Sequence, residues 1–250
     1  MPASVLSRRS AGAKLLALAA GLASGMAQAA WGAVRGNGVR RTDSRAVTGF
    51  TGIALAVPGQ LALRLGPTES VTLEADENIL PLVETTVTGG SLQIRTRRGQ
   101  DIDPQVLRIV VQARQIDSLS VAGSGTITGV ALTGRTLKLD LGGSGDIVLQ
   151  RASFDALGVS VGGSGNIRLD GKARAMKLSL AGSGGVTADG LLVDEARISI
   201  AGSGSASVSA RTSLEVSIAG SGSVRYHGDP TLTRSIAGSG DVQRIGSLPS

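Results

Sequence analysis

The chain has 250 residues, with 25 Lys and Arg, 19 Asp and Glu, 37 Gly, one His, no Cys and four aromatic residues. The lack of Cys excludes a disulfide framework and a lipid-modified N-terminal Cys. No Lys/Arg-rich block and no aromatic platform is present, which argues against nucleic-acid binding. With so few large side chains, the composition favours a narrow core of Leu, Ile and Val.

Residues 1–29 have the order of a secretory signal peptide. Arg8, Arg9 and Lys14 precede a short apolar run that ends in Ala27-Gln28-Ala29, an A-x-A cleavage site. The run is too short for a membrane span of about 20 residues. Cleavage removes three basic side chains and lowers the formal charge from +6 to +3. We therefore expect an exported protein, periplasmic, cell-surface or extracellular, with no integral membrane segment in the mature chain.

The next part of the chain shows strand and turn signals. Residues 30–46 predict an extended lead-in, because they carry Gly and Arg with little apolar periodicity. From residue 47 to 120, short alternating or β-branched runs are broken by Gly and Pro, which predicts irregular β-rungs. These runs cover residues 50–57, 61–65, 71–75, 92–94 and 106–111, and residues 76–83 could form a single helical turn.

Gly-Ser-Gly returns seven times in the second half, with its serines 20, 20, 19, 20, 18 and 18 residues apart. Three residues before each serine, every copy is aliphatic, and the residues five before and three after are almost all aliphatic. The residues between are polar or small. Period two on both sides of each corner predicts strand, turn, strand. The predicted turns are Gly123-Ser124-Gly125, Gly143-Ser144-Gly145, Gly163-Ser164-Gly165, Gly182-Ser183-Gly184, Gly202-Ser203-Gly204, Gly220-Ser221-Gly222 and Gly238-Ser239-Gly240.

A repeat of 18–20 residues leaves no room for a helix between its strands, so the copies must stack as rungs of a β-solenoid. We predict an all-β, right-handed parallel β-helix. Residues 47–245 are predicted to form a single solenoid domain, with seven Gly-Ser-Gly rungs over 121–245 and a tail at 246–250. Arg234 falls in a column that is otherwise aliphatic, which indicates that the stack ends there.

The glycine-rich corners could also serve as ligand loops. No Lys and no helix follows Gly-Ser-Gly, so a phosphate loop is disfavoured against a structural turn. The position two after the serine holds carboxylates only at Asp146 and Asp241, too far apart for a row of calcium sites. We expect no metal and no cofactor.

Two carboxylates remain as an alternative catalytic pair. Asp170 and Asp189 both stand six residues after a corner serine, on adjacent rungs, with His227 two rungs further on. Paired carboxylates could serve acid and base chemistry on a glycan. Each is followed by Gly, however, and this favours a turn at both positions. A glycan-active lyase or hydrolase is therefore the weaker alternative.

A polar column lies four residues before the corner serines. It holds a serine strip, Ser160, Ser179, Ser199 and Ser217, with Ser120 and Ser235 beyond its ends. Such a column is most often a solvated sheet face. The other reading is contact with something extended: a glycan, another envelope component or a second copy of the chain.

The order of several short motifs resembles the head GIN domain family, secreted bacterial proteins labelled as auto-transporter adhesins. The resemblance runs from about residue 36 to 245 and rests on VTGFTGI at 47–53, VTLEADENI at 71–79, GSLQI at 90–94 and the Gly-Ser-Gly copies. It implies a β-helix-like fold at the cell envelope and supplies no catalytic residue. The sequence as a whole thus predicts a secreted, non-catalytic β-solenoid that acts in binding, adhesion or scaffolding.

Overall fold

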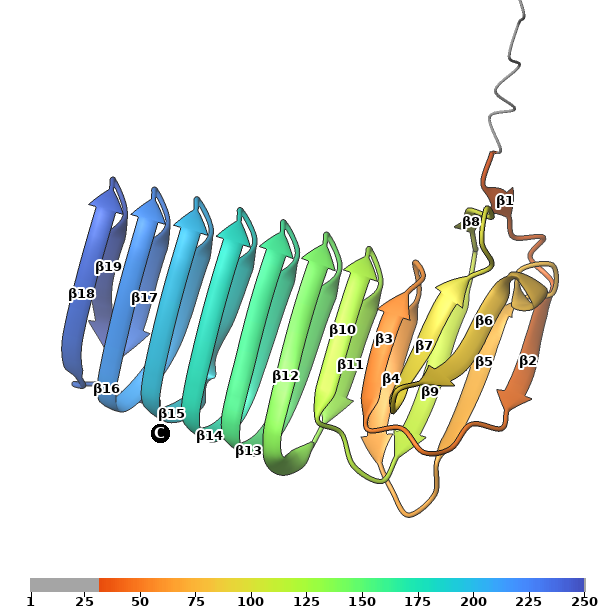
Figure 1. Cartoon of the computed structure of the whole chain (residues 1–250), viewed down its shortest axis with the longest axis horizontal. Coiled ribbons are helices and arrows are strands. Elements are labelled where there is room, and N and C mark those ends of the chain that lie inside the picture. The colour runs from red at the N-terminus through yellow and green to blue at the C-terminus, as the bar shows by residue number, and fades with distance from the viewer. Residues whose placement is uncertain (1–31, 250) are drawn as a thin grey trace, which may run out of the picture. The chain divides into compact units, whose positions relative to one another are not determined.

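The computed structural model describes residues 32–249, and the predicted signal peptide at 1–29 lies outside this range. The described chain is nearly all strand (Figure 1). In the second half the strands are β10 (Ser118–Gly123), β11 (Thr126–Val130), β12 (Thr133–Gly143), β13 (Asp146–Gly163), β14 (Asn166–Gly182), β15 (Gly185–Gly202), β16 (Ser205–Gly220), β17 (Ser223–His227), β18 (Thr231–Gly238) and β19 (Asp241–Gly246).

These strands stack as parallel coils, as the repeat predicts. The register carries each aliphatic column from rung to rung, for example Val121, Leu141, Val161, Leu180, Ile200, Ile218 and Ile236. The predicted β-solenoid is confirmed, with about six turns between the first and last corner. Its right-handedness stays a prediction.

Each coil contributes one strand to each of two sheets, and the two sheets meet at the Gly-Ser-Gly corners. The strand before the corner lies in one sheet, here called the front sheet, and the strand after it lies in the opposite sheet, the back sheet. At the far end of the four middle coils the strand bends without a break, so that β13 to β16 each run from one corner to the next, whereas a short gap separates β11 from β12 and β17 from β18. The register shifts at these bends, for instance between Leu149 and Ala152.

The two glycines of each corner have different tasks. The first has a φ between +105° and +135° in all seven copies, a region that L side chains rarely adopt. The last has no such φ, but it lies against the preceding rung: a Cβ on Gly184 would be 2.6 Å from the carbonyl oxygen of Gly165. Glycine is therefore needed for its backbone conformation at the first position and for close packing at the last.

The core is the space between the two sheets. The inward aliphatic residues of every complete rung are buried, with exposures of 2% or less for Leu139, Val159, Leu178 and Ile198. Each such side chain contributes about 1.5–3 kcal/mol of transfer free energy, which offsets the conformational entropy lost on folding. Phe50, Phe154 and Tyr226 add the few aromatic side chains, so Leu, Ile and Val supply most of the core, as the composition indicates.

The first half extends the same stack. Its strands are β1 (Val34–Arg35), β2 (Arg40–Arg45), β3 (Gly52–Ala56), β4 (Gln60–Leu65), β5 (Ser70–Asp76), β6 (Val83–Thr88), β7 (Ser91–Thr96), β8 (Ile102–Asp103) and β9 (Leu107–Ala113), with a short 3-10 helix at Leu80–Leu82. β3 pairs in parallel with β10 and β7, and β4 pairs in parallel with β11 and β9. Pro58-Gly59 forms the corner between β3 and β4 in place of Gly-Ser-Gly.

Antiparallel strands close this end. β6 pairs with β7, β5 pairs with β9, and β2 pairs with β5, all antiparallel. In Figure 1 they stand at the warm-coloured end of the stack. Residues 40–45, expected only as part of an extended lead-in, form one of these strands. At the opposite end the last coil, β18 and β19, pairs only with β16 and β17 among the described residues.

Candidate functional site

The serine strip is a real ladder on the front sheet. Ser160, Ser179, Ser199 and Ser217 are direct partners on successive strands, and all four side chains are exposed. Ser235 continues the ladder on β18, whereas Asp140 interrupts it between Ser120 and Ser160. Hydroxyl groups are thus presented at the rung spacing of about 4.8 Å, each able to donate and to accept a hydrogen bond.

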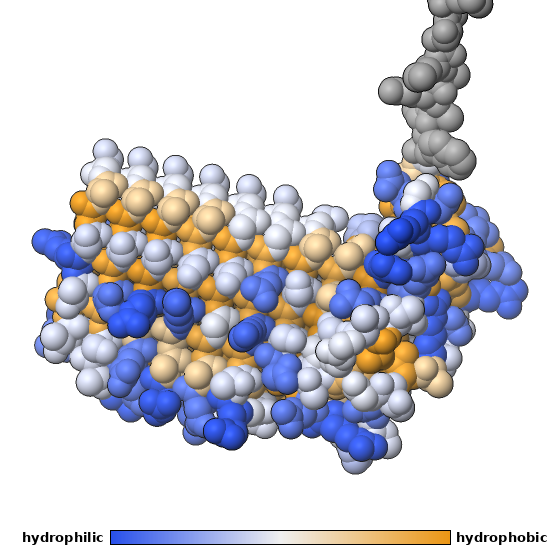
Figure 2. Space-filling model, in the orientation of Figure 1, coloured by the Kyte–Doolittle hydropathy of each residue, from blue (hydrophilic) through white to orange (hydrophobic). Residues whose placement is uncertain are grey.

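Two further columns flank the strip. On the corner side stand small exposed residues, Ala122, Gly142, Gly162, Ala181, Ala201, Ala219 and Ala237. On the bend side stands a column, here called the basic column, of Lys138, Gly158, Lys177 and Arg197, followed by Glu215. Figure 2 shows this sheet as rows of small and apolar residues, with blue charged side chains gathered toward the bend. The surface is flat near the corner and basic further down.

A shallow groove lies beside the basic column. It has a volume of about 340 Å³, and its floor is formed by Leu157, Met176, Ala196 and Leu214, which are direct partners on β13 to β16. Lys177, Arg197 and Glu215 form one wall, with Arg197 Nε bonded to Glu215 Oε2 at 2.7 Å. The groove therefore follows the axis of the coil, parallel to the serine strip.

A second hollow of about 380 Å³ lies nearer the bend, lined by alternating charges. Asp155, Arg174, Asp194 and Arg211 stand on successive rungs around it, and Arg211 Nη1 lies 3.0 Å from Asp194 Oδ1. Because the Arg211–Asp194 pair is largely open to solvent, it contributes only about 0–1 kcal/mol to stability. Opposite charges nevertheless favour the observed register of one rung on the next.

The Gly-Ser-Gly corners use their own N–H groups in the stack. Ser144 N and Gly145 N both donate to Gly123 O, at 2.9 and 2.8 Å, and Asp146 N donates to Gly125 O at 3.1 Å. The same pattern recurs at the next corner, where Ser164 N and Gly165 N donate to Gly143 O. Donors that bond the preceding rung do not point at a ligand, which agrees with the interpretation of the corners as structural turns.

Asp170 and Asp189 lie at the bends of adjacent rungs, but one residue out of register. The register runs from Arg168 opposite Thr187 to Asp170 opposite Gly190, so Asp189 falls in the intervening irregularity. Asp170 is exposed and Asp189 is half-buried. Asp189 Oδ1 is buried with no hydrogen-bond partner among the described residues. His227 Nδ1 lies 3.0 Å from the carbonyl oxygen of Ser247. The equal spacing from the corner serines predicts that the three side chains share one column. In the structure they do not.

A positive φ, which favours Gly, occurs directly after two of these three side chains. Gly171 and Gly228, which follow Asp170 and His227, have φ of +129° and +102°. Gly190, after Asp189, is not in this region. Ser209 Oγ instead donates to the carbonyl oxygen of Asp189 at 2.7 Å and fixes the irregular backbone there.

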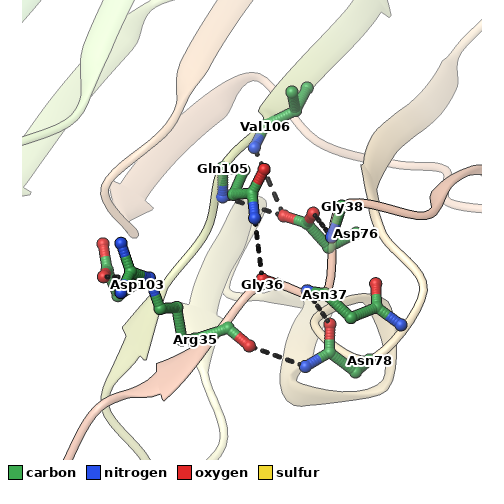
Figure 3. Close-up of polar contacts among 9 residues, drawn as sticks. All are labelled: Arg35, Gly36, Asn37, Gly38, Asp76, Asn78, Asp103, Gln105 and Val106. Atoms are coloured by element: carbon green, nitrogen blue, oxygen red, sulfur yellow. Dashed lines mark hydrogen bonds and ion pairs between the residues drawn. The ribbon is translucent and has the colours of Figure 1, made fainter.

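A buried carboxylate organises the N-terminal end, and the sequence pattern did not identify it (Figure 3). Asp76 is fully buried at the end of β5. Its Oδ1 accepts a hydrogen bond from Gly38 N at 2.9 Å, and its Oδ2 accepts from Gln105 N at 2.9 Å and Val106 N at 3.3 Å. The carboxylate thereby joins the segment after β1 to the segment before β9.

Asn78 completes this cluster. Its Oδ1 accepts from Asn37 N at 3.0 Å, and its Nδ2 donates to Arg35 O at 2.8 Å. Gly36 lies between them, where a Cβ would collide with the Asp76 carboxylate. The Asp-x-Asn of the 71–79 motif therefore has a structural task, which is to hold the chain that closes the stack.

Burial alone would raise the pKa of Asp76, but hydrogen bonds from the N–H groups of Val106, Gly38 and Gln105, together with its own backbone, outweigh this effect. The pKa of Asp76 is therefore below its ordinary value of 3.8. At neutral pH the Asp76 carboxylate is therefore charged in the folded protein.

Within residues 32–249, no group of three or more His, Asp and Glu side chains is placed to hold a metal ion. Over the same residues, no helix is long and apolar enough to cross a membrane.

Comparisons with known proteins place the chain in a family. A sequence model described as "Putative auto-transporter adhesin, head GIN domain" matches residues 49–230. No curated protein matches the chain.

Several solved structures share the fold. A "putative adhesin" from Bacteroides fragilis NCTC 9343 has a TM-score of 0.78 and 21% identity, covering 85% of this chain and 100% of that one. A "putative lipid binding protein" from Parabacteroides distasonis ATCC 8503 has a TM-score of 0.72 and 25% identity, with 85% and 99% covered. A "putative adhesin" from Parabacteroides merdae ATCC 43184 has a TM-score of 0.67 and 24% identity, with 85% and 98% covered. Since the family match spans well over half of the residues, and the motifs in the sequence point the same way, this chain belongs to the head GIN domain family.

Proposed function

We propose that this protein is an exported, non-catalytic binding protein of the cell envelope or surface, and that the front sheet binds an extended glycan. Membership of a family described as adhesins supports an adhesion-type role and a surface or exported location. The observation that carries the finer proposal is the serine strip: exposed hydroxyl groups in strict register over successive rungs, flanked by small residues and by Lys138, Lys177 and Arg197.

A linear glycan fits this surface chemically. It presents hydroxyl groups along an extended chain, and each serine can donate to one and accept from another. The adjacent groove gives an apolar floor for the less polar face of a sugar ring, and the basic column can bind acidic sugars. The small residues beside the corner let such a chain lie flat against the backbone.

The test is a glycan array probed with the mature protein and with Ser179→Lys combined with Ser199→Lys. Two long charged side chains in the middle of the strip should abolish the signal. The matched control is Asn166→Lys with Ser205→Lys, which adds the same charge at exposed positions of the back sheet and should leave it intact. Binding that survives the front-sheet change, or that the back-sheet change removes, would contradict the proposal.

Glycan cleavage through Asp170 and Asp189 is the second candidate, and the unpartnered Oδ1 of Asp189 is the observation in its favour. Incubation of the protein with each glycan that binds should then release shorter fragments. Asp170→Asn combined with Asp189→Asn should abolish that release while binding persists. Cleavage that survives both changes shows that the pair is not catalytic, and a lack of cleavage supports the binding role.

A further inference from the structure

The C-terminal end of the coil exposes backbone that every other rung uses in the stack. β18 pairs with β16 and β19 pairs with β17, and within residues 32–249 neither strand has a second neighbour. The edge of a sheet presents a row of free N–H and C=O groups, which another β-strand satisfies well. At the other end of the same stack, β2, β5 and β6 cover the corresponding surface.

Apolar side chains are exposed on this end face as well. Ile236 continues the column of Ile200 and Ile218, which are 1% exposed, yet Ile236 is 38% exposed. Ile245 on β19 is 42% exposed. A further rung would cover Ile236 as β18 covers Ile218, whereas Ile245 is the extra residue at the register shift opposite Tyr226 and His227.

Two arginines set the chemistry of the occupant. Arg234 stands in the inward column above Val216, and Arg244 stands above Tyr226. Arg234 has no ion pair among the described residues. Arg244 donates from Nε to Gly228 O at 2.6 Å, and its only carboxylate neighbour in the described chain is Asp229, 3.9 Å away and 93% exposed. The end face thus combines an unpaired strand edge with two positive charges that lack close counter-ions.

This charge disfavours a second copy of the chain. Two such end faces in contact would bring four arginines together. Stacking of the end face on the N-terminal end would place β19 against β2, where Arg41 and Arg45 pair with Glu77 and Asp43 but Arg40 has no ion pair among the described residues. Like charges that meet across an interface cost several kcal/mol.

We propose that the C-terminal end face, formed by β18 and β19, binds an acidic β-strand of another protein, which adds to the stack as a further rung. Main-chain hydrogen bonds supply the affinity, and carboxylates over Arg234 and Arg244 supply the specificity. This surface is separate from the serine strip, so a glycan on the front sheet and a protein strand at the end can bind together. The end face is only as large as the cross-section of one coil. The area buried on binding is therefore small, and the affinity will be modest.

The proposal is tested with two 16-residue peptides and the mature protein. One peptide copies residues 231–246, and the other carries Arg234→Glu and Arg244→Glu, so that its glutamates lie over the arginines of the protein when it stacks in register. Fluorescence anisotropy should show that the glutamate peptide binds about tenfold or more tightly than the natural one, an advantage that declines as salt is raised. In the protein variant Arg234→Glu with Arg244→Glu, the preference should reverse.

The control variant is Arg168→Glu with Arg225→Glu, which makes the same change in net charge at outward positions and should leave the preference unchanged. Inward charges also protect sheet edges from self-association. If this were their only task, neither peptide would bind and the proposal would be overturned. Equal binding of both peptides, or a preference that does not reverse, would also overturn it. So would a dimer of the unmodified protein at micromolar concentration in sedimentation, which would assign the end face to a second copy.

Discussion

At the residue scale, the glycine that ends each corner is held by contact with the rung before it. Gly184 has no positive φ, but a Cβ there would lie 2.6 Å from Gly165 O and 2.9 Å from Val161 Cγ1. Gly184→Ala should therefore destabilise the fold by about 1–3 kcal/mol, the usual range for overpacking. Denaturant titration measures this change. Ser183→Ala in the same corner is the control and should stay within about 0.5 kcal/mol. Equal effects of the two changes would show that close packing at the corner is not the cause.

Asp76 makes the N-terminal end sensitive to acid. Its pKa is lowered in the folded protein, so its contribution to stability is fully present above its ordinary pKa of 3.8 and is lost as the pH falls from there through the lower folded pKa. Hydrogen exchange at the amides of residues 38, 105 and 106 should accelerate over that range, beyond the intrinsic pH dependence. Asp76→Asn should loosen the same amides at neutral pH and remove the acid response.

The control for this experiment is Asp103→Asn, which removes an exposed carboxylate 3.9 Å from Arg35 in the same end of the molecule. Its effect should be much smaller, because exposed pairs contribute little to stability. If the amides of residues 38, 105 and 106 stay protected in Asp76→Asn, then the carboxylate does not hold the N-terminal end together.

At the scale of elements, the aliphatic ladders carry the stability of the stack. Leu178 lies between Val159 and Ile198 in the front sheet and is fully buried. Leu178→Ala should cost about 2–5 kcal/mol. Ser179→Ala, the adjacent outward residue, should change the unfolding free energy by less than about 0.5 kcal/mol. A similar loss from both changes would contradict the assignment of inward and outward columns.

The repeated part of the fold was predictable because each column samples one environment seven times. The first half lacks this redundancy. Its strands could be found from alternation, and those at residues 50–57, 61–65, 71–75, 92–94 and 106–111 correspond to β3, β4, β5, β7 and β9. Their pairing could not be found: β5 and β6 run antiparallel to the rungs, and the chain inserts β9 between β4 and β5. Nothing in a local pattern encodes such a long-range order.

The site was predictable to the same extent. The alignment of Ser160, Ser179, Ser199 and Ser217 on successive strands follows from strict register, while their role in binding stays a proposal. The column that was to join Asp170, Asp189 and His227 is broken, because the bends tolerate extra residues that a simple count from the corner cannot detect. In the sequence Asp76 stands out only as part of the motif at 71–79, because its burial depends on two segments far from it in the chain.

At the scale of the whole molecule, the solenoid repeats one small surface along an axis. One face offers hydroxyl groups in a row, and one end offers an open sheet edge with two arginines. A protein built in this way can hold an extended polymer along its side while its end contacts another protein. Both properties follow from parallel stacking and do not need a deep pocket.

Recognition by a row of rungs makes binding depend on ligand length, and this is the most direct test of the proposed function. The four serines from Ser160 to Ser217 span three rung steps, or about 14 Å. On an array that presents each linear glycan at increasing lengths, binding of the mature protein should rise with length until the ligand covers this distance, and it should be lost in Ser179→Lys with Ser199→Lys. Equal binding of the shortest and longest members of a series, or the absence of any signal above background, would contradict the account.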